Sequence, residues 1–164
     1  RYRFLGVDYL TRQCFQIELT GEPTGKKISW EDLLGPFFDL ETGEIRPKSD
    51  FSAPVEQWFL RNGLEEGDQC TYGLVDALLD PPYGIRVTDT DGSTKKQLVQ
   101  RFLKLVFGYD AVFGSFESLP LIFSWSTDWS NYFEAGKEWW GAFYWTILLE
   151  EKQEIIVIGA SATD

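Results

Sequence analysis

The feature that most constrains the fold is the aromatic segment from Trp125 to Ile158. Five of the seven tryptophans lie within residues 125–145. The run 139–149 is rich in aromatic and β-branched residues, which favour a pleated strand. The charged run 150–154 separates it from the apolar run 155–158. We therefore predict a β-hairpin with a loop of about four or five residues.

Side chains alternate between the two faces of a strand, so this segment can be divided by face. One face would carry Trp139, Gly141, Phe143, Trp145, Ile147 and Leu149. The other would carry Trp140, Ala142, Tyr144, Thr146 and Leu148. Because both sets are mainly apolar, we expect the hairpin to lie centrally in its sheet and to be covered on both faces.

Two other segments have the periodicity of amphipathic helices. The first spans about residues 53–62, follows Ser52 as its cap, and would bury Val55, Trp58 and Phe59. The second spans about residues 94–107, and its predicted apolar face consists of Leu98, Val99, Phe102, Leu103 and Val106. Gly63 and Gly108 supply the expected C-terminal stops.

Shorter elements complete the prediction. Ser29 can cap a short helix over 30–34, because Asp32 stands where a capping box places an acid. The patterns also predict strands over 1–9, 13–19, 85–88 and 119–125, whereas 71–79 fits a short helix or a buried strand. The order of strands, helices and strands predicts a single α+β domain over residues 1–164. Its mostly antiparallel sheet would end in the tryptophan-rich hairpin, with the two main helices packed on one face.

The 164-residue chain contains no histidine, which excludes several kinds of chemistry. Ser-His-Asp and Cys-His catalysis, His-ligated zinc and His-ligated haem all need an imidazole. The sequence also lacks a Gly-x-Ser-x-Gly elbow, a Walker A loop and a dinucleotide-binding fingerprint. We therefore expect no cofactor or metal, and favour a function other than catalysis.

Composition also bears on the compartment. No apolar run approaches the roughly 18 residues that a membrane span needs. No signal-peptide pattern is present. Because the chain begins with Arg1 rather than methionine, a leader peptide that has been removed is an alternative. Cys14 and Cys70 have no metal-ligand spacing and are expected to be reduced, buried thiols rather than a disulfide in a cytosolic protein. We expect a cytoplasmic protein without a membrane partner.

The chain is strongly acidic, with 15 basic and 26 acidic residues and a net charge of −11. Such a charge repels nucleic-acid phosphates and attracts basic partners. One group of acids lies in the middle of the chain, and the predicted contact residues there are Glu65, Glu66, Asp68, Asp76 and Asp80. A docking surface for a basic partner and a plain solvated face both fit this group.

A second group mixes acids with aromatic rings. The predicted contact residues in it are Asp128, Trp129, Tyr132, Glu134 and Glu138. Large rings beside carboxylates form protein-binding hot spots, and they also line sugar-binding clefts, where paired carboxylates hydrolyse glycosides. Core packing is the third interpretation. Because residues 126–136 are polar, Trp129 and Tyr132 are the rings expected at the surface.

These observations lead to three hypotheses. The first is a non-enzymatic, acidic protein-binding domain of the bacterial immunity or antitoxin type, which would cover a basic toxin or nuclease without binding nucleic acid itself. The second is a carbohydrate-binding or glycoside-hydrolysing domain that uses Trp125, Trp129 and Trp139 together with Asp128, Glu134 or Glu138. The third is a structural or accessory domain of a larger protein. Partner identity and oligomeric state stay open.

Overall fold

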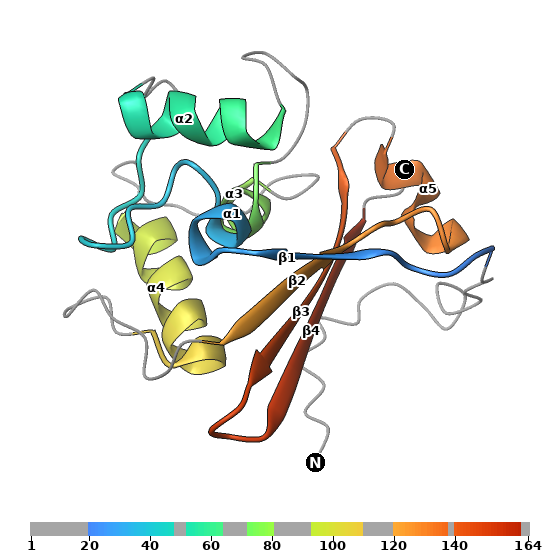
Figure 1. The fold of residues 1–164 in the computed structure, drawn as a ribbon. Helices are drawn as coiled ribbons and strands as arrows, with labels where there is room; N and C mark the ends of the chain where they lie inside the picture. Colours follow the sequence, from blue (N-terminus) through green and yellow to red (C-terminus); the bar gives the residue numbers. More distant parts are fainter. Residues whose placement is uncertain are drawn as a thin grey trace.

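The structure is a computed structural model that describes residues 20–47, 52–63, 72–80, 93–109, 120–137 and 140–161. It is an α+β fold with one antiparallel sheet in the order β1-β2-β3-β4 (Figure 1). The strands are β1 Gly25–Ile28, β2 Leu121–Trp125, β3 Ala142–Leu149 and β4 Glu154–Ser161. The helices are α1 Trp30–Leu34, α2 Ala53–Asn62, α3 Leu74–Leu79, α4 Ser93–Phe107 and α5 Glu134–Lys137, and the 3-10 turn η1 spans Asn131–Phe133.

A row of isoleucines crosses the face of the sheet that meets the helices. The strand register places Ile28 beside Ile122, Ile122 beside Ile147, and Ile147 beside Ile156. Ile122 and Ile147 are almost fully buried against Leu33 of α1 and the other residues of the main core. A buried aliphatic side chain of this size contributes about 1.5–3 kcal/mol, so the row fixes which face of the sheet turns inward.

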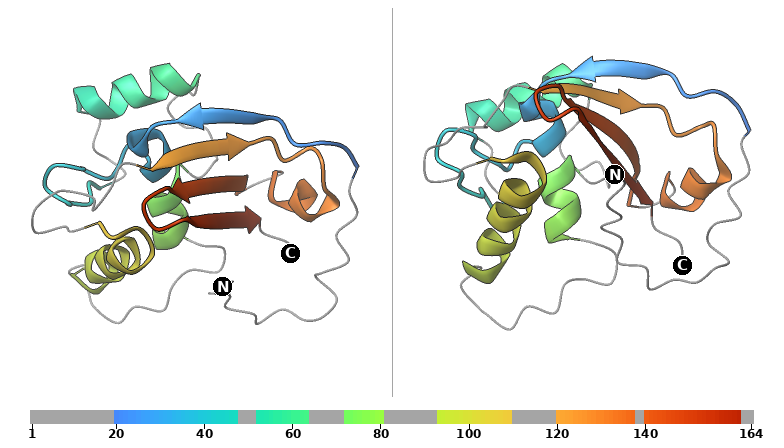
Figure 2. Two further views of the ribbon diagram at one scale, coloured as in Figure 1. Left: turned by 60° about the horizontal axis from the view of Figure 1, so that its bottom comes forward. Right: turned by 90° about the horizontal axis from the view of Figure 1, so that it is seen from below.

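Helices α1, α3 and α4 lie on that face (Figures 1 and 2). They bury Leu34 of α1, Val75 of α3, and Val99, Leu103 and Phe107 of α4. Helix α2 packs differently, because Trp58 and Phe59 form a second cluster with Phe37, Val55 and Tyr72. The indole nitrogen of Trp58 donates to the carbonyl oxygen of Glu31, so α2 is joined to the sheet through α1.

The predicted helices and the C-terminal hairpin are confirmed. The side chain of Ser29 accepts a hydrogen bond from the backbone N–H of Asp32, as the capping pattern predicts. Residues 74–79 form a helix rather than a strand, and Gly63 ends α2 in the left-handed conformation. The hairpin turn is Glu150–Gln153, between the paired residues Leu149 and Glu154.

Two expectations about burial were wrong. Strand β3 is central, but among the described strands β4 pairs only with β3, and Ile155 and Val157 are 68% and 55% exposed. Both side chains lie on the face of the sheet opposite the helices. Leu98 is also 44% exposed, because α4 centres its buried stripe on Val99, Leu103 and Phe107.

The strands predicted over 1–9, 13–19 and 85–88 lie outside the described residues, as do both cysteines. Within the described ranges, no helix has the length and apolar character to cross a membrane.

Candidate protein-binding surface

The connection between β2 and β3 lies at the end of the sheet away from α2 and α4 (Figures 1 and 2). It carries a cluster of aromatic rings. The ring of Trp129 meets Phe133 at 5.5 Å and Tyr144 of β3 at 5.3 Å, both edge to face. Tyr132 contacts Phe133 at 5.0 Å in the same geometry. Phe133 is buried, whereas Trp129 and Tyr132 are half-buried. Each of these two rings therefore has one part in the core and one part at the surface.

Hydrogen bonds hold this connection in one conformation. The side chain of Ser130 accepts from the N–H of Tyr132 and begins η1. The indole nitrogen of Trp129 donates to the carbonyl oxygen of Ser126. Thr20 lies alongside, where its N–H donates to Trp129 O at 2.8 Å and its hydroxyl donates to Asp128 O at 3.0 Å. The aromatic cluster is thus preorganised, which lowers the entropy cost of binding a partner.

Acidic side chains border these rings. Asp128 is 87% exposed at its side chain and forms an ion pair with Lys137 of α5. Glu134, the first residue of α5, is also exposed. An exposed ion pair contributes little to stability, so the pair leaves Asp128 available at the surface at small cost. We call Asp128, Trp129, Tyr132 and Glu134 the aromatic–acidic surface.

Of the acids predicted in the middle of the chain, the structure describes Asp76 and Asp80. Glu65, Glu66 and Asp68 lie outside the described residues, as does Glu138. Asp80 is exposed at the end of α3. Asp76 is 4% exposed, and its carboxylate accepts a hydrogen bond from the N–H of Tyr72 at 3.1 Å. Asp76 therefore lies beneath the molecular surface and stabilises the start of α3.

A tryptophan links Asp80 to helix α5. The indole nitrogen of Trp140 donates to the carbonyl oxygen of Asp80 at 3.0 Å. The backbone N–H of Trp140 in turn donates to Gly136 O in α5. Helix α3 and the segment that carries the aromatic–acidic surface are thereby held together, although they are distant in sequence.

Sequence reasoning did not assign Phe133 and Tyr144 to this cluster. Phe133 could have been found from the sequence, because it lies four residues after Trp129. Side chains four residues apart come together where the chain turns helically, as it does after Ser130. Tyr144 was placed on a strand face, but which ring it would meet depends on the path of the β2–β3 connection. Trp125, proposed for sugar binding, lies on the sheet face of Tyr144 and Thr146, and its indole nitrogen donates to the Thr146 hydroxyl at 2.9 Å.

Comparison with known proteins adds no family to this picture. The chain matches no protein-family model, no curated protein and no solved structure. Among the described residues, no group of three or more His, Cys, Asp or Glu side chains is placed to hold a metal ion.

Proposed function

We propose that this chain is a non-enzymatic, acidic binding domain that covers a basic protein partner with its aromatic–acidic surface. A partner of this kind would be a toxin or nuclease, for which the chain would act as an immunity-type inhibitor. One observation carries the proposal. Two exposed acids and two half-buried rings lie on the same hydrogen-bonded segment, namely Asp128, Glu134, Trp129 and Tyr132.

The physical argument combines two effects. The net charge of −11 attracts a cationic partner from a distance and accelerates its encounter. The rings of Trp129 and Tyr132 then supply contact area. Their packing against Phe133 already reduces the conformational entropy of these two side chains, so less entropy is lost on binding. Exposed carboxylates around half-buried rings match the usual anatomy of a protein interface, in which an apolar centre has a polar rim.

The test is affinity capture from an extract of the organism that encodes the chain, with a matched pair of variants. D128N/E134Q removes two charges from the aromatic–acidic surface. E150Q/E151Q removes two exposed charges from the β3–β4 turn. The turn lies at the opposite end of the eight-residue strand β3, roughly 26 Å away along the strand. Both variants carry the same net charge, so the comparison isolates the position of the charges.

We expect the wild type and E150Q/E151Q to retain the same basic protein, and D128N/E134Q to weaken its binding by about tenfold or more. Equal retention by both variants would contradict the assignment of the surface, and so would the absence of a basic protein. Retention of a glycan in place of a protein would favour the carbohydrate hypothesis.

A further inference from the structure

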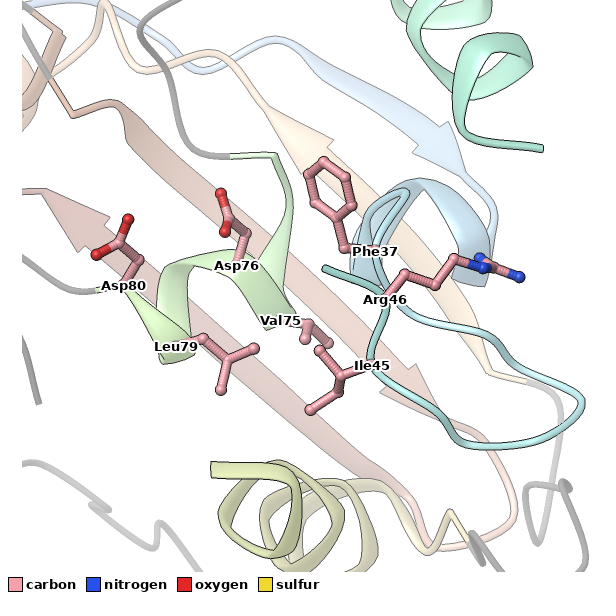
Figure 3. A pocket seen from close by; sticks show the side chains of 7 residues that line it. All are labelled: Phe37, Ile45, Arg46, Val75, Asp76, Leu79 and Asp80. Atoms are coloured by element: carbon pink, nitrogen blue, oxygen red, sulfur yellow. The ribbon is translucent and has the colours of Figure 1, made fainter. Parts of the chain in front are cut away.

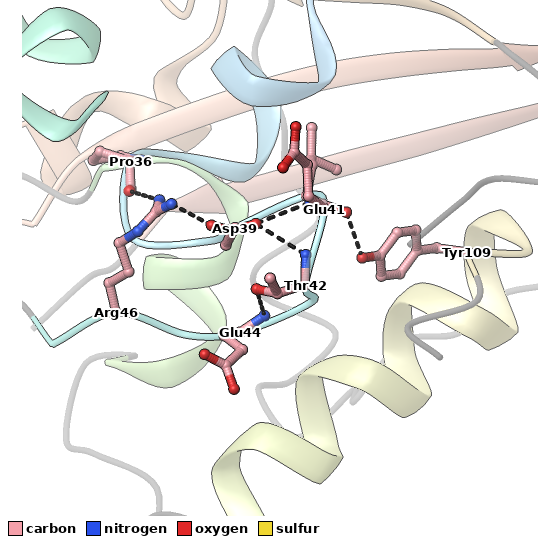
Figure 4. Close-up of polar contacts among 8 residues, drawn as sticks. Pro36, Asp39, Glu41, Thr42, Glu44, Arg46 and Tyr109 are labelled. Carbon is pink, nitrogen blue, oxygen red and sulfur yellow. Dashed lines mark hydrogen bonds and ion pairs between the residues drawn. The ribbon is translucent and has the colours of Figure 1, made fainter. Parts of the chain in front are cut away.

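The charged groups of the pocket beside α3 have partners within the domain. The pocket, of about 300 Å³, lies between α3 and the segment that follows α1 (Figure 3). Arg46 in its lining donates to the carboxylate of Asp39 and to the carbonyl oxygen of Pro36 (Figure 4). The carboxylate of Asp76 accepts from the N–H of Tyr72. The edge of the sheet at β4 differs, because none of the described strands pairs with its outer side.

Strand β4 lacks the features by which sheet edges are usually protected. Its eight residues pair with β3 without a break in register, so no bulge turns the edge away. Residues 155–161 contain no charged residue and no proline. Ile155 and Val157 are 68% and 55% exposed on the face of the sheet opposite the helices. An unprotected apolar edge of this kind presents backbone N–H and C=O groups to another strand.

The opposite edge of the sheet, β1, is protected. It has only four residues, and two of them are the exposed lysines Lys26 and Lys27. A short edge strand and charged side chains are two of the means by which proteins prevent strand pairing between molecules. The sheet is therefore closed to a further strand at β1 and open to one at β4.

We propose that β4 pairs with β4 of a second copy of this chain, in antiparallel orientation about a twofold axis at Ile156. Such an interface uses the same surface on both copies, so each contact occurs twice. In this register Ile155 lies beside Val157 of the second copy, and Ile156 lies beside Ile156 of the second copy. The two exposed apolar side chains of β4 each gain an apolar cross-strand neighbour.

The row of isoleucines in the sheet favours this register. The row crosses all four strands and reaches the edge at its last member, in the order Ile28, Ile122, Ile147 and Ile156. With the axis at Ile156, the same row of the second copy continues it across the interface. The two sheets then form one sheet of eight strands with the same face turned towards the helices.

Charge favours a second copy over a basic partner at this edge. The net charge of −11 makes two copies repel each other wherever their acids meet. Glu154 is the one charged residue of β4, and the register separates the two Glu154 residues by four positions, about 13 Å along the strands. This separation exceeds the Debye length of about 8 Å at physiological salt. A basic partner would meet no carboxylate between residues 155 and 161.

The size of the contact predicts a weak dimer. The edge of an eight-residue strand is about 27 Å long and about 10 Å deep. Its area is well below the roughly 800 Å² that each partner buries in a standard interface. We therefore expect reversible association with a Kd between about 10 μM and 1 mM. Dimer formation is independent of the binding of a basic partner by the aromatic–acidic surface.

The test is sedimentation equilibrium of the 164-residue chain from about 5 μM to 1 mM, with a reductant present so that no disulfide links two copies. The edge variants are V157K and I155K. The matched control is L60K, because Leu60 is 79% exposed on α2 and the substitution changes the net charge by the same amount. Amide exchange of the wild type at both ends of the concentration range shows which strand associates.

We expect the mass of the wild type and of L60K to rise from 18.9 kDa towards twice that value with concentration. V157K and I155K should associate at least about tenfold more weakly, although the added lysine lowers the net negative charge. Amides of β4 that point away from β3 should exchange more slowly at high concentration, while those of β1 stay unchanged. A wild type that is monomeric throughout, association of V157K and I155K equal to that of the wild type, or association without slower exchange in β4 would overturn the proposal.

Discussion

The indole nitrogen of Trp140 donates a hydrogen bond of 3.0 Å to the backbone carbonyl oxygen of Asp80, 60 residues earlier in the chain. The bond fastens the end of α3 to the segment before β3. The Trp140 ring also contacts Phe143 edge to face at 5.9 Å, which anchors it on the strand side. The end of α3 and the segment before β3 are therefore mechanically connected.

Replacement of Trp140 by Phe should loosen the end of α3. The variant loses the hydrogen bond but keeps an aromatic ring against Phe143, so we expect a loss of about 1 kcal/mol in the free energy of unfolding. Amide exchange at Asp80, whose N–H donates to Asp76 O, should accelerate. W125F loses a comparable bond to Thr146 and serves as the control. Equal acceleration at Asp80 in W125F would refute the local coupling.

Asp39 should make stability depend on acid pH. The N–H of Thr42, the guanidinium of Arg46 and the N–H of Glu41 together lower the pKa of Asp39 below its usual 3.8, against the opposing effect of burial. A lowered folded-state pKa stabilises the protein above the unfolded pKa, and this contribution is lost as pH falls through the folded value.

The measurement is urea unfolding of the wild type and D39N from about pH 6 to pH 2. D39N should be less stable near pH 6 by about 1–2 kcal/mol, and the difference should shrink towards pH 2. E41Q, an exposed residue of the same loop, is the control and should keep the wild-type profile. A constant difference across the pH range would contradict the role given to Asp39.

Two glycines fix the crossing of α1 and α3. Gly35 and Gly73 have φ angles of +94° and +88°, and a Cβ on Gly35 would lie 1.9 Å from the carbonyl oxygen of Tyr72. A Cβ on Gly73 would lie 2.7 Å from the Cα of Gly35, so neither site has room for a side chain. We expect G35A and G73A each to cost more than about 3 kcal/mol in unfolding free energy.

Gly63 provides the matched control for these two substitutions. It also has a positive φ of +67°, but nothing lies within 4 Å of the position that a Cβ would occupy. G63A should therefore cost only about 1–2 kcal/mol, which is the conformational penalty alone. Equal costs in all three variants would show that backbone conformation, rather than the close approach, determines the effect.

The two faces of the hairpin should respond differently to truncation. Ile147 is fully buried against the helices, so I147A should cost about 2–5 kcal/mol. Val157 is 55% exposed on the opposite face, so V157T should change stability by less than about 0.5 kcal/mol. Thermal or urea unfolding of the two variants gives the comparison, and a large loss in V157T would show that this face is packed.

The sequence predicted the helices and strands themselves better than it predicted which elements would pack against one another. Local sequence patterns were sufficient to predict the cap at Ser29, the buried stripe of α2 and the alternation along β3. The exposure of Ile155 and Val157 depends on β4 having β3 as its sole partner among the described strands, and no local pattern carries that information. Asp76 looked like one of several surface acids, but it is 4% exposed and its carboxylate accepts the N–H of Tyr72, which depends on how the start of α3 is packed.

The most direct test of the central claim is the salt dependence of the captured complex. The Kd of the purified wild-type chain with its basic partner is measured at about 0.05 M and 1 M salt, where the Debye length shrinks from more than 10 Å to about 3 Å. We expect the Kd to rise steeply with salt for the wild type and less steeply for D128N/E134Q. A Kd that is insensitive to salt, or a slope that D128N/E134Q leaves unchanged, would contradict binding through these carboxylates.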